Sequence, residues 1–144
     1  MRKGEREQKM LEGLRASGLK LTPQRLAIVR ELADDVTHPT AQELFDRLSS
    51  TLPTTSFATL YNTLGTLAEA GLCQLKSFGP GPARFDPNTE AHHHAVCDRC
   101  GAVTDVPIPS GMGVTSPIGD GFAVRAVERI YRGICASCQK SDAS

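Results

Sequence analysis

The chain has 144 residues, equal numbers of basic and acidic residues, and 40% hydrophobic residues. This length accommodates one medium domain or two small ones, and the composition differs from that of a disordered, highly charged tail. Because no apolar run approaches the roughly 18 residues of a transmembrane helix, and the start MRKGEREQKM lacks the apolar core of a signal peptide, we expect a cytosolic protein.

The balanced net charge conceals an excess of positive charge at the start of the chain. Residues 1–30 carry eight Lys or Arg residues and three Glu residues. Such an excess occurs on nucleic-acid-binding surfaces, but it is also typical of a solvated helix face. Charge alone favours the solvated face.

The first half of the chain carries the signals of successive helices. A short apolar stripe of Leu11 and Leu14 ends near Gly18. Further helix starts are indicated at Thr22-Pro23, at the capping box Thr40 to Glu43, and at Ser56. The helix expected over residues 56–69 has one apolar face, which consists of Phe57, Leu60, Leu64 and Leu67. Gly71 suits the end of that helix.

Strands are predicted in the rest of the chain. Residues 73–78 and 83–86 flank a Gly-Pro-Gly-Pro turn, and a hairpin after about three helices is the order of a winged helix-turn-helix domain. The composition shifts at residues 87–89. Later strands are predicted at 92–97, 102–106 and 122–134, and no helix is predicted in the Gly- and Pro-rich stretch 110–121.

Two CxxC pairs, Cys97/Cys100 and Cys135/Cys138, are separated by 34 residues. Four thiolates bind zinc in a tetrahedron, and each CxxC turn places two of them on the same ion. Such a closed shell would be structural. The alternatives are two disulfides or four unrelated core cysteines, but cytosolic thiols stay reduced, so we favour zinc. The remaining Cys73 is most simply a buried hydrophobic side chain.

Three consecutive histidines, His92 to His94, precede the first CxxC pair. Alternation along a strand places His92 and His94 on one face and His93 on the other. Asp86 and Asp105 offer oxygen ligands, and mixed nitrogen and oxygen donors favour Fe or Mn over Ca or Mg. Histidines are also common as structural residues, and the spacing alone leaves both interpretations open.

The order of these motifs resembles the ferric uptake regulator (Fur) family of metal-dependent bacterial repressors, from about Leu11 to Cys138. The resemblance is carried by residues 18–25 (GLKLTPQR), 38–41 (HPTA), 56–64 (SFATLYNTL), 71–72 (GL), 84–86 (RFD) and 92–101 (HHHAVCDRCG). These segments extend over both halves of the chain.

The resemblance implies an α+β chain with a winged-helix DNA-binding domain over 1–86 and a small α/β dimerisation and metal-binding domain over 87–144. It implies a homodimer on a palindromic, A/T-rich DNA operator. A regulatory Fe²⁺ or Mn²⁺ ion would be bound by residues of both halves. The implied ligands are His38, Asp86, His92, His94 and Asp105. Metal binding would favour the DNA-competent arrangement.

Within the family, the chain is most similar to the peroxide-sensing (PerR-type) branch, whose three His and two Asp ligands all have counterparts here. The iron-sensing branch usually has Glu in place of Asp105 and a further His shortly before Tyr131, where this chain has none. The zinc-sensing branch uses a regulatory Cys, and Cys73 lies several residues from that place. His93 departs from the branch and could extend or vary the site.

This resemblance implies a repressor that senses peroxide through metal-catalysed oxidation of His38 or His92. The alternative is a plain iron-, manganese- or zinc-responsive repressor of the same family. A hydrolytic metalloenzyme is disfavoured, because no acid–base pair is evident beyond the metal ligands.

The helix over residues 56–69 is expected to enter the DNA major groove. The residues predicted to contact bases or phosphates lie off its apolar face and are Thr59, Tyr61, Asn62, Thr63 and Thr66. Arg15 and Lys20 are candidates for phosphate or minor-groove contacts. Alternatively, several of the threonines only solvate the helix.

Overall fold

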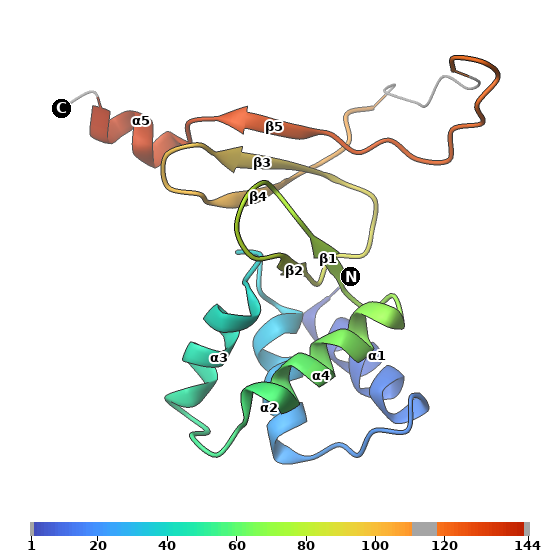
Figure 1. The fold of residues 1–144 in the computed structure, drawn as a ribbon, viewed down its shortest axis with the longest axis vertical. Coiled ribbons are helices and arrows are strands. Elements are labelled where there is room, and N and C mark those ends of the chain that lie inside the picture. Colours follow the sequence, from blue (N-terminus) through green and yellow to red (C-terminus); the bar gives the residue numbers. More distant parts are fainter. Residues whose placement is uncertain (1, 111–117, 143–144) are drawn as a thin grey trace. The chain divides into compact units, whose positions relative to one another are not determined.

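The protein is described by a computed structural model that covers residues 2–110 and 118–142. Its internal contacts divide the chain into two compact units, residues 1–89 and 90–144. The first unit consists of helices and a short hairpin, and the second consists of a sheet and a helix (Figure 1). Among the described residues, no helix is both long and apolar enough to cross a membrane.

The helices of the first unit are α1 (Lys3–Ala16), α2 (Pro23–Ala33), α3 (Ala41–Ser49) and α4 (Phe57–Glu69). Three of them begin where the sequence predicts, because a side-chain oxygen caps the first turn. The oxygens of Thr22, Thr40 and Ser56 each accept the backbone N–H three residues further on, at 3.1 to 3.3 Å. Each cap contributes about 1 kcal/mol to helix stability.

The end of α4 also follows the prediction. Gly71 has a φ of 73°, in the left-handed region, and its N–H donates to the Ala68 carbonyl at 3.1 Å. The N–H of Leu72 donates to the Leu67 carbonyl at 2.9 Å. These two bonds form a Schellman motif, in which a residue with a Cβ would be strained at the position of Gly71.

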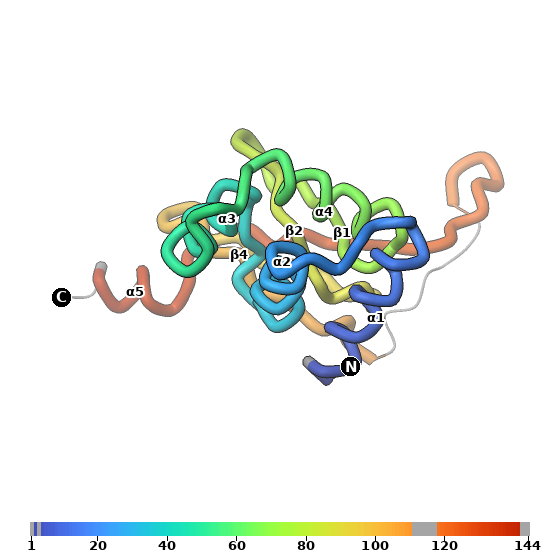
Figure 2. The backbone as a smooth tube through the Cα atoms, turned by 90° about the horizontal axis from the view of Figure 1, so that it is seen from below, coloured from blue at the N-terminus to red at the C-terminus, as the bar shows by residue number. Residues whose placement is uncertain are grey.

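The helices pack around α2, which contacts α1, α3 and α4 (Figure 2). Their common core is aliphatic, and its fully buried side chains include Met10, Leu14, Ile28, Leu32, Leu44, Leu60, Leu64 and Leu67. Phe57 is an exception to the predicted apolar face, since it is 40% exposed and its ring lies 5.4 Å from that of Phe45. The first unit therefore has a complete hydrophobic core of its own.

A short antiparallel hairpin completes the first unit. It consists of β1 (Gln74–Lys76) and β2 (Arg84–Asp86), with Leu75 paired to Phe85. Phe85 and Cys73 belong to the buried core. Burial, together with the nearby Asp86 charge, raises the pKa of the Cys73 thiol to about 12, so this thiol stays protonated and unreactive. The prediction of a buried, hydrophobic Cys73 is confirmed.

The second unit contains a three-stranded sheet of order β4-β3-β5 (Figure 1). The central strand β3 (His93–Cys97) pairs antiparallel with β4 (Val103–Val106) and parallel with β5 (Ile130–Gly133). The helix α5 (Ala136–Asp142) follows β5. The strands predicted at 92–97 and 102–106 are confirmed, with ends that differ by one residue.

The long strand predicted over residues 122–134 is wrong. Within it only β5 is a strand, because β3 is short and offers partners only from His94 to Cys97. Phe122 forms an isolated bridge with Ile118 instead. The helix α5 was not predicted, because its short polar sequence lacks an apolar stripe. Most of the Gly- and Pro-rich stretch 110–121 lies outside the described residues.

Candidate functional site

The sulfur atoms of both CxxC pairs meet in the second unit. Cys97 and Cys100 lie in the turn after β3, and Cys135 and Cys138 lie at the start of α5. The Cys97–Cys138 and Cys100–Cys135 Sγ distances are 3.8 and 3.7 Å, and all four atoms lie within 4.8 Å of one another. Four thiolates bound tetrahedrally at about 2.3 Å from one zinc ion would be roughly 3.8 Å apart.

This geometry favours a metal site over the two alternatives for the cysteines. A disulfide requires sulfur atoms about 2.05 Å apart, whereas all of these cysteines are free. Four unrelated core cysteines would not converge. The cluster therefore fits a closed, tetrahedral metal site.

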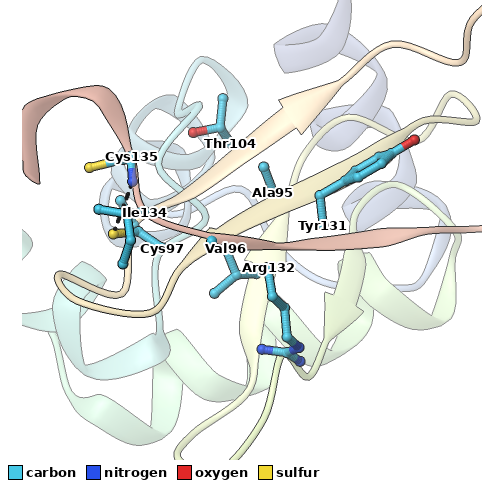
Figure 3. A pocket seen from close by; sticks show the side chains of 10 residues that line it. Ala95, Val96, Cys97, Thr104, Tyr131, Arg132, Ile134 and Cys135 are labelled. Carbon is cyan, nitrogen blue, oxygen red and sulfur yellow. Dashed lines mark hydrogen bonds between the residues drawn. The ribbon is translucent and has the colours of Figure 1, made fainter. Parts of the chain in front are cut away.

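Backbone amides already favour the thiolate at one corner of this cluster. The Cys97 Sγ accepts N–H bonds from Cys100 at 3.4 Å and from Cys135 at 3.3 Å, the second of which is dashed in Figure 3. These bonds lower the pKa of Cys97 to about 6. In contrast, hydrogen bonding to Cys135, with burial, raises the pKa of Cys138 to about 12. A divalent cation would stabilise all four thiolates at once.

The first unit contributes a His–Asp pair. His38 Nε2 lies 3.4 Å from the Oδ2 atom of Asp86, the last residue of β2. The other carboxylate oxygen of Asp86 accepts the Asn88 N–H at 2.9 Å, which fixes the orientation of the carboxylate. The pair thus presents a nitrogen and an oxygen that could bind one cation.

The backbone at His38 is strained and is held by the hairpin. His38 has a φ of 57°, a left-handed conformation that costs a non-glycine residue about 1–2 kcal/mol. Its carbonyl accepts a bond from Arg84 Nη1 at 3.0 Å, and the Phe85 N–H donates to the Pro39 carbonyl at 2.8 Å. The strand that carries Asp86 therefore also positions His38.

The second unit contributes two histidines and an aspartate. His94 and Asp105 are direct cross-strand partners on β3 and β4, and His92 lies on the same face, as strand alternation predicts. The distances are 3.0 Å between the two Nε2 atoms, 3.2 Å from His92 Nε2 to Asp105 Oδ1, and 3.6 Å from His94 Nε2 to Asp105 Oδ1. Ligands about 2.1 Å from one ion are roughly 3.0 Å apart at a right angle and roughly 3.4 Å apart at a tetrahedral angle. The triad fits a transition-metal ion.

His93 points to the other face of the sheet and has a different role. Its Nδ1 accepts the Arg129 N–H at 3.1 Å, and the centroid of its ring lies 6.2 Å from that of the Tyr131 ring. The lone pair of Nδ1 is therefore not available to a metal ion, and His93 does not belong to the group of side chains that converge around Asp105. His93 therefore attaches the segment before β5 to β3, a role that the sequence did not reveal.

Glu128 was also missed by the sequence analysis. Its Oε1 atom lies 3.2 Å from His94 Nδ1. The surrounding sequence, Arg125 to Arg132, contains no motif, and only the strand pairing brings this carboxylate to His94.

The predicted DNA contacts differ in their accessibility. Tyr61 is 58% exposed, and Asn62, Arg15 and Lys20 are also exposed. Thr59 is half-buried. Thr66 is half-buried, and its hydroxyl donates to the Asn62 carbonyl at 3.0 Å.

The prediction for Thr63 requires a correction. Its side chain is fully buried, and its hydroxyl donates to the Thr59 carbonyl at 2.7 Å. Position 63 continues the helical spacing of Leu60, Leu64 and Leu67, so it lies on the core face of α4. Thr63 is therefore not available to contact DNA.

A sequence profile described as "Ferric uptake regulator family" matches residues 16–117, which is well over half of the chain. The chain belongs to the ferric uptake regulator family. It is 35% identical over 135 residues to the "Peroxide operon regulator" of Bacillus subtilis (strain 168), and the match covers 92% of each chain. It is 36% identical over 132 residues to the "Peroxide-responsive repressor PerR" of Staphylococcus aureus (strain Mu50 / ATCC 700699), covering 90% of this chain and 88% of that one.

The fold is likewise that of the family. The solved structure of the Helicobacter pylori ferric uptake regulator Fur aligns with a TM-score of 0.74 at 17% identity, over 96% of this chain and 95% of that one. The predicted fold class, a winged helix-turn-helix domain followed by a small α/β domain, is confirmed.

Proposed function

We propose that this protein is a metal-dependent transcriptional repressor that releases its DNA operator when it is exposed to peroxide. The observation that carries the proposal is the donor set, three His nitrogens and two Asp oxygens, presented as a pair by the first unit and a triad by the second. One relative described as a peroxide operon regulator and one described as a peroxide-responsive repressor support the same response. The alternative is a plain iron-, manganese- or zinc-responsive repressor of this family.

Two kinds of metal ion are proposed. Cys97, Cys100, Cys135 and Cys138 would hold a structural Zn²⁺ ion, since four thiolates suit zinc and leave no open position. His38, Asp86, His92, His94 and Asp105 would together hold a regulatory Fe²⁺ or Mn²⁺ ion, since mixed nitrogen and oxygen donors suit these metals. Because these ligands come from both units, the ion would bind best to one arrangement of the units. Its binding would therefore favour the DNA-competent arrangement.

The peroxide response would be a change in one ligand. An Fe²⁺ ion held by these residues would supply the redox chemistry that activates hydrogen peroxide, and the imidazole ring would be the net donor of the two electrons that the peroxide takes up. One oxygen atom of the peroxide would be added to a ring carbon of His38 or His92, and the other would leave as water. The oxidised ring is a poorer nitrogen donor, so the regulatory site loses a ligand. The cysteines would not respond, since zinc holds them in a closed shell.

The DNA-binding surface would lie on the first unit, over residues 1–86. We propose that α4 enters the major groove with Thr59, Tyr61 and Asn62, and that Arg15 and Lys20 contact the backbone or the minor groove. The exposed Tyr61 ring would pack on a thymine methyl group. The operator would be palindromic and A/T-rich, since the two halves of a palindrome match the two subunits of a symmetric dimer. The protein would act in the cytoplasm.

The dimer interface would lie on the second unit, over residues 87–144. Ala95, Thr104 and Tyr131 lie on one side of the sheet (Figure 3). They line an open pocket of about 180 Å³. Apolar residues at and near β5 remain exposed, including Ile130, Tyr131 and Ile134. A second copy of the chain that covered this surface would remove it from water.

The proposal is tested with protein loaded with Fe²⁺ or Mn²⁺ and treated with hydrogen peroxide. We expect the iron form to lose operator binding in a gel shift and to gain one oxygen on a His38 or His92 peptide in mass spectrometry, while the manganese form keeps both unchanged. Mass gain only on a cysteine or methionine would contradict peroxide sensing through histidine. Loss of binding on metal removal alone, with no effect of peroxide, would favour the plain metal regulator.

His38→Ala separates metal sensing from folding. We expect the variant to remain a folded, zinc-containing dimer whose operator binding no longer responds to Fe²⁺ or Mn²⁺. Metal-responsive operator binding by this variant would exclude His38 from the regulatory site.

A further inference from the structure

The two ligand histidines of the second unit are held differently at their other ring nitrogen. Their Nε2 atoms face Asp105, so each Nδ1 atom lies on the side of its ring that points away from Asp105. His92 Nδ1 lies 2.6 Å from the carbonyl oxygen of Glu90, whereas His94 Nδ1 lies 3.2 Å from the carboxylate of Glu128. A carbonyl and a carboxylate are the two groups that usually orient a metal-binding imidazole.

The carboxylate has the stronger effect of the two. A hydrogen bond from the ring N–H to a charged group is roughly twice as strong as one to a neutral acceptor. It keeps the proton on Nδ1 and makes Nε2 a better donor to the metal ion. His94 would therefore be the better donor of the two histidines.

Backbone hydrogen bonds position Glu128 beside His94. The next residue, Arg129, forms hydrogen bonds to β3 through both its N–H and its carbonyl group. The Arg129 N–H donates to His93 Nδ1 at 3.1 Å, and the Arg129 carbonyl accepts the His94 N–H at 3.1 Å. Directly after it, β5 begins at Ile130, which pairs with His94. The backbone beside Glu128 is thus fixed to the strand that carries His94.

We propose that Glu128 is a positioning residue of the regulatory metal site, which fixes the tautomer and orientation of His94 and strengthens its donor atom. This inference rests on the proposed function, since it assumes that His94 binds the regulatory ion through Nε2. Glu128 is not a ligand of that ion, because it contacts the ring nitrogen on the opposite side. His93 supports Glu128 through the backbone of Arg129.

The test measures Mn²⁺ binding to the full-length, zinc-containing protein by competition with a chromophoric chelator. We expect Glu128→Ala to weaken Mn²⁺ binding about 10–100-fold, the usual effect of losing such a partner. Glu128→Gln keeps an acceptor without the charge, so we expect a smaller loss, of about tenfold or less. Asp120→Asn is the matched control, since it removes one exposed carboxylate from the same unit, and we expect its affinity to stay within about twofold of the parent.

Zinc content and the melting temperature of the protein without regulatory metal distinguish positioning from folding. Both should be unchanged in the Glu128 variants. The inference is overturned if Glu128→Ala binds Mn²⁺ as tightly as the parent, if Asp120→Asn loses as much affinity, or if the loss is accompanied by a loss of zinc or of melting temperature. If His94→Ala itself binds Mn²⁺ like the parent, the proposed regulatory site fails, whatever the effect of Glu128.

Discussion

The two units of this molecule are stabilised in different ways. The first unit encloses an aliphatic core contributed by its helices and by the hairpin. Among the described residues of the second unit, the buried apolar side chains are only Cys97 and Val103, while β5 is exposed along its whole length. Small domains without a sufficient core need a metal, a disulfide or a partner subunit. We therefore expect the second unit, unlike the first, to depend on a metal ion at its cysteine cluster and on a partner that covers its exposed sheet.

The largest effect should come from removing a cysteine ligand. We expect Cys97→Ser to abolish zinc binding and to unfold the second unit, because structural zinc sites contribute roughly 10–16 kcal/mol to the folding of small domains. The helices of the first unit should persist. Zinc analysis, size-exclusion chromatography and circular dichroism check this, with Cys73→Ser as a comparison outside the cluster. A zinc-free, folded dimer would show that the two units do not differ in this way.

A core substitution should affect the first unit instead. Leu64 is fully buried in α4, and we expect Leu64→Ala to reduce the free energy of unfolding by about 2–5 kcal/mol. Urea unfolding followed by circular dichroism measures the loss. Zinc content should be unchanged, since the cysteines belong to the other unit. Simultaneous loss of zinc would mean that the two units do not fold independently.

A smaller effect is expected at the exposed sheet surface of the second unit. Tyr131 is 41% exposed, and we expect Tyr131→Asp to weaken the proposed dimer by roughly 2 kcal/mol, because a charge would be buried at the proposed interface. Analytical ultracentrifugation over a concentration series measures this change. Thr104→Ser on the same face is a conservative control. An unchanged dimer would place the interface elsewhere.

The smallest effect concerns an ion pair of the first unit. Burial raises the pKa of Asp35, but bonds from Thr37 and Arg47 outweigh this and hold that pKa below 3.8. A carboxyl group whose pKa is lowered by folding stabilises the folded state at pH values above its unfolded-state pKa. This stabilisation is lost as the pH falls through its folded-state pKa. We expect Asp35→Asn to cost roughly 0.5–1 kcal/mol at neutral pH.

That cost should disappear in strong acid. Urea unfolding of parent and variant at pH 7 and near pH 2 provides the comparison. An equal difference at both pH values would show that the Asp35 charge is not the cause.

The sequence by itself determined the features that depend on neighbours along the chain. The helix starts at Thr22, Thr40 and Ser56 follow from bonds that reach three residues. The common face of His92 and His94 follows from strand alternation. The two CxxC pairs indicated a metal site, because a pair with this spacing brings two sulfur atoms together wherever the rest of the chain lies.

Only the tertiary structure decided the features that depend on distant partners. The helical spacing already placed Thr63 beside Leu60 and Leu67, but only the packing of α4 showed that this polar side chain is buried, with its hydroxyl satisfied by the preceding turn. The length of β5 was set by the edge that β3 offers, and the role of His93 by the Arg129 amide, 36 residues away. Glu128 reaches His94 across 34 residues for the same reason. A side chain's own sequence neighbourhood contains no information about a partner that only the pairing of strands brings near.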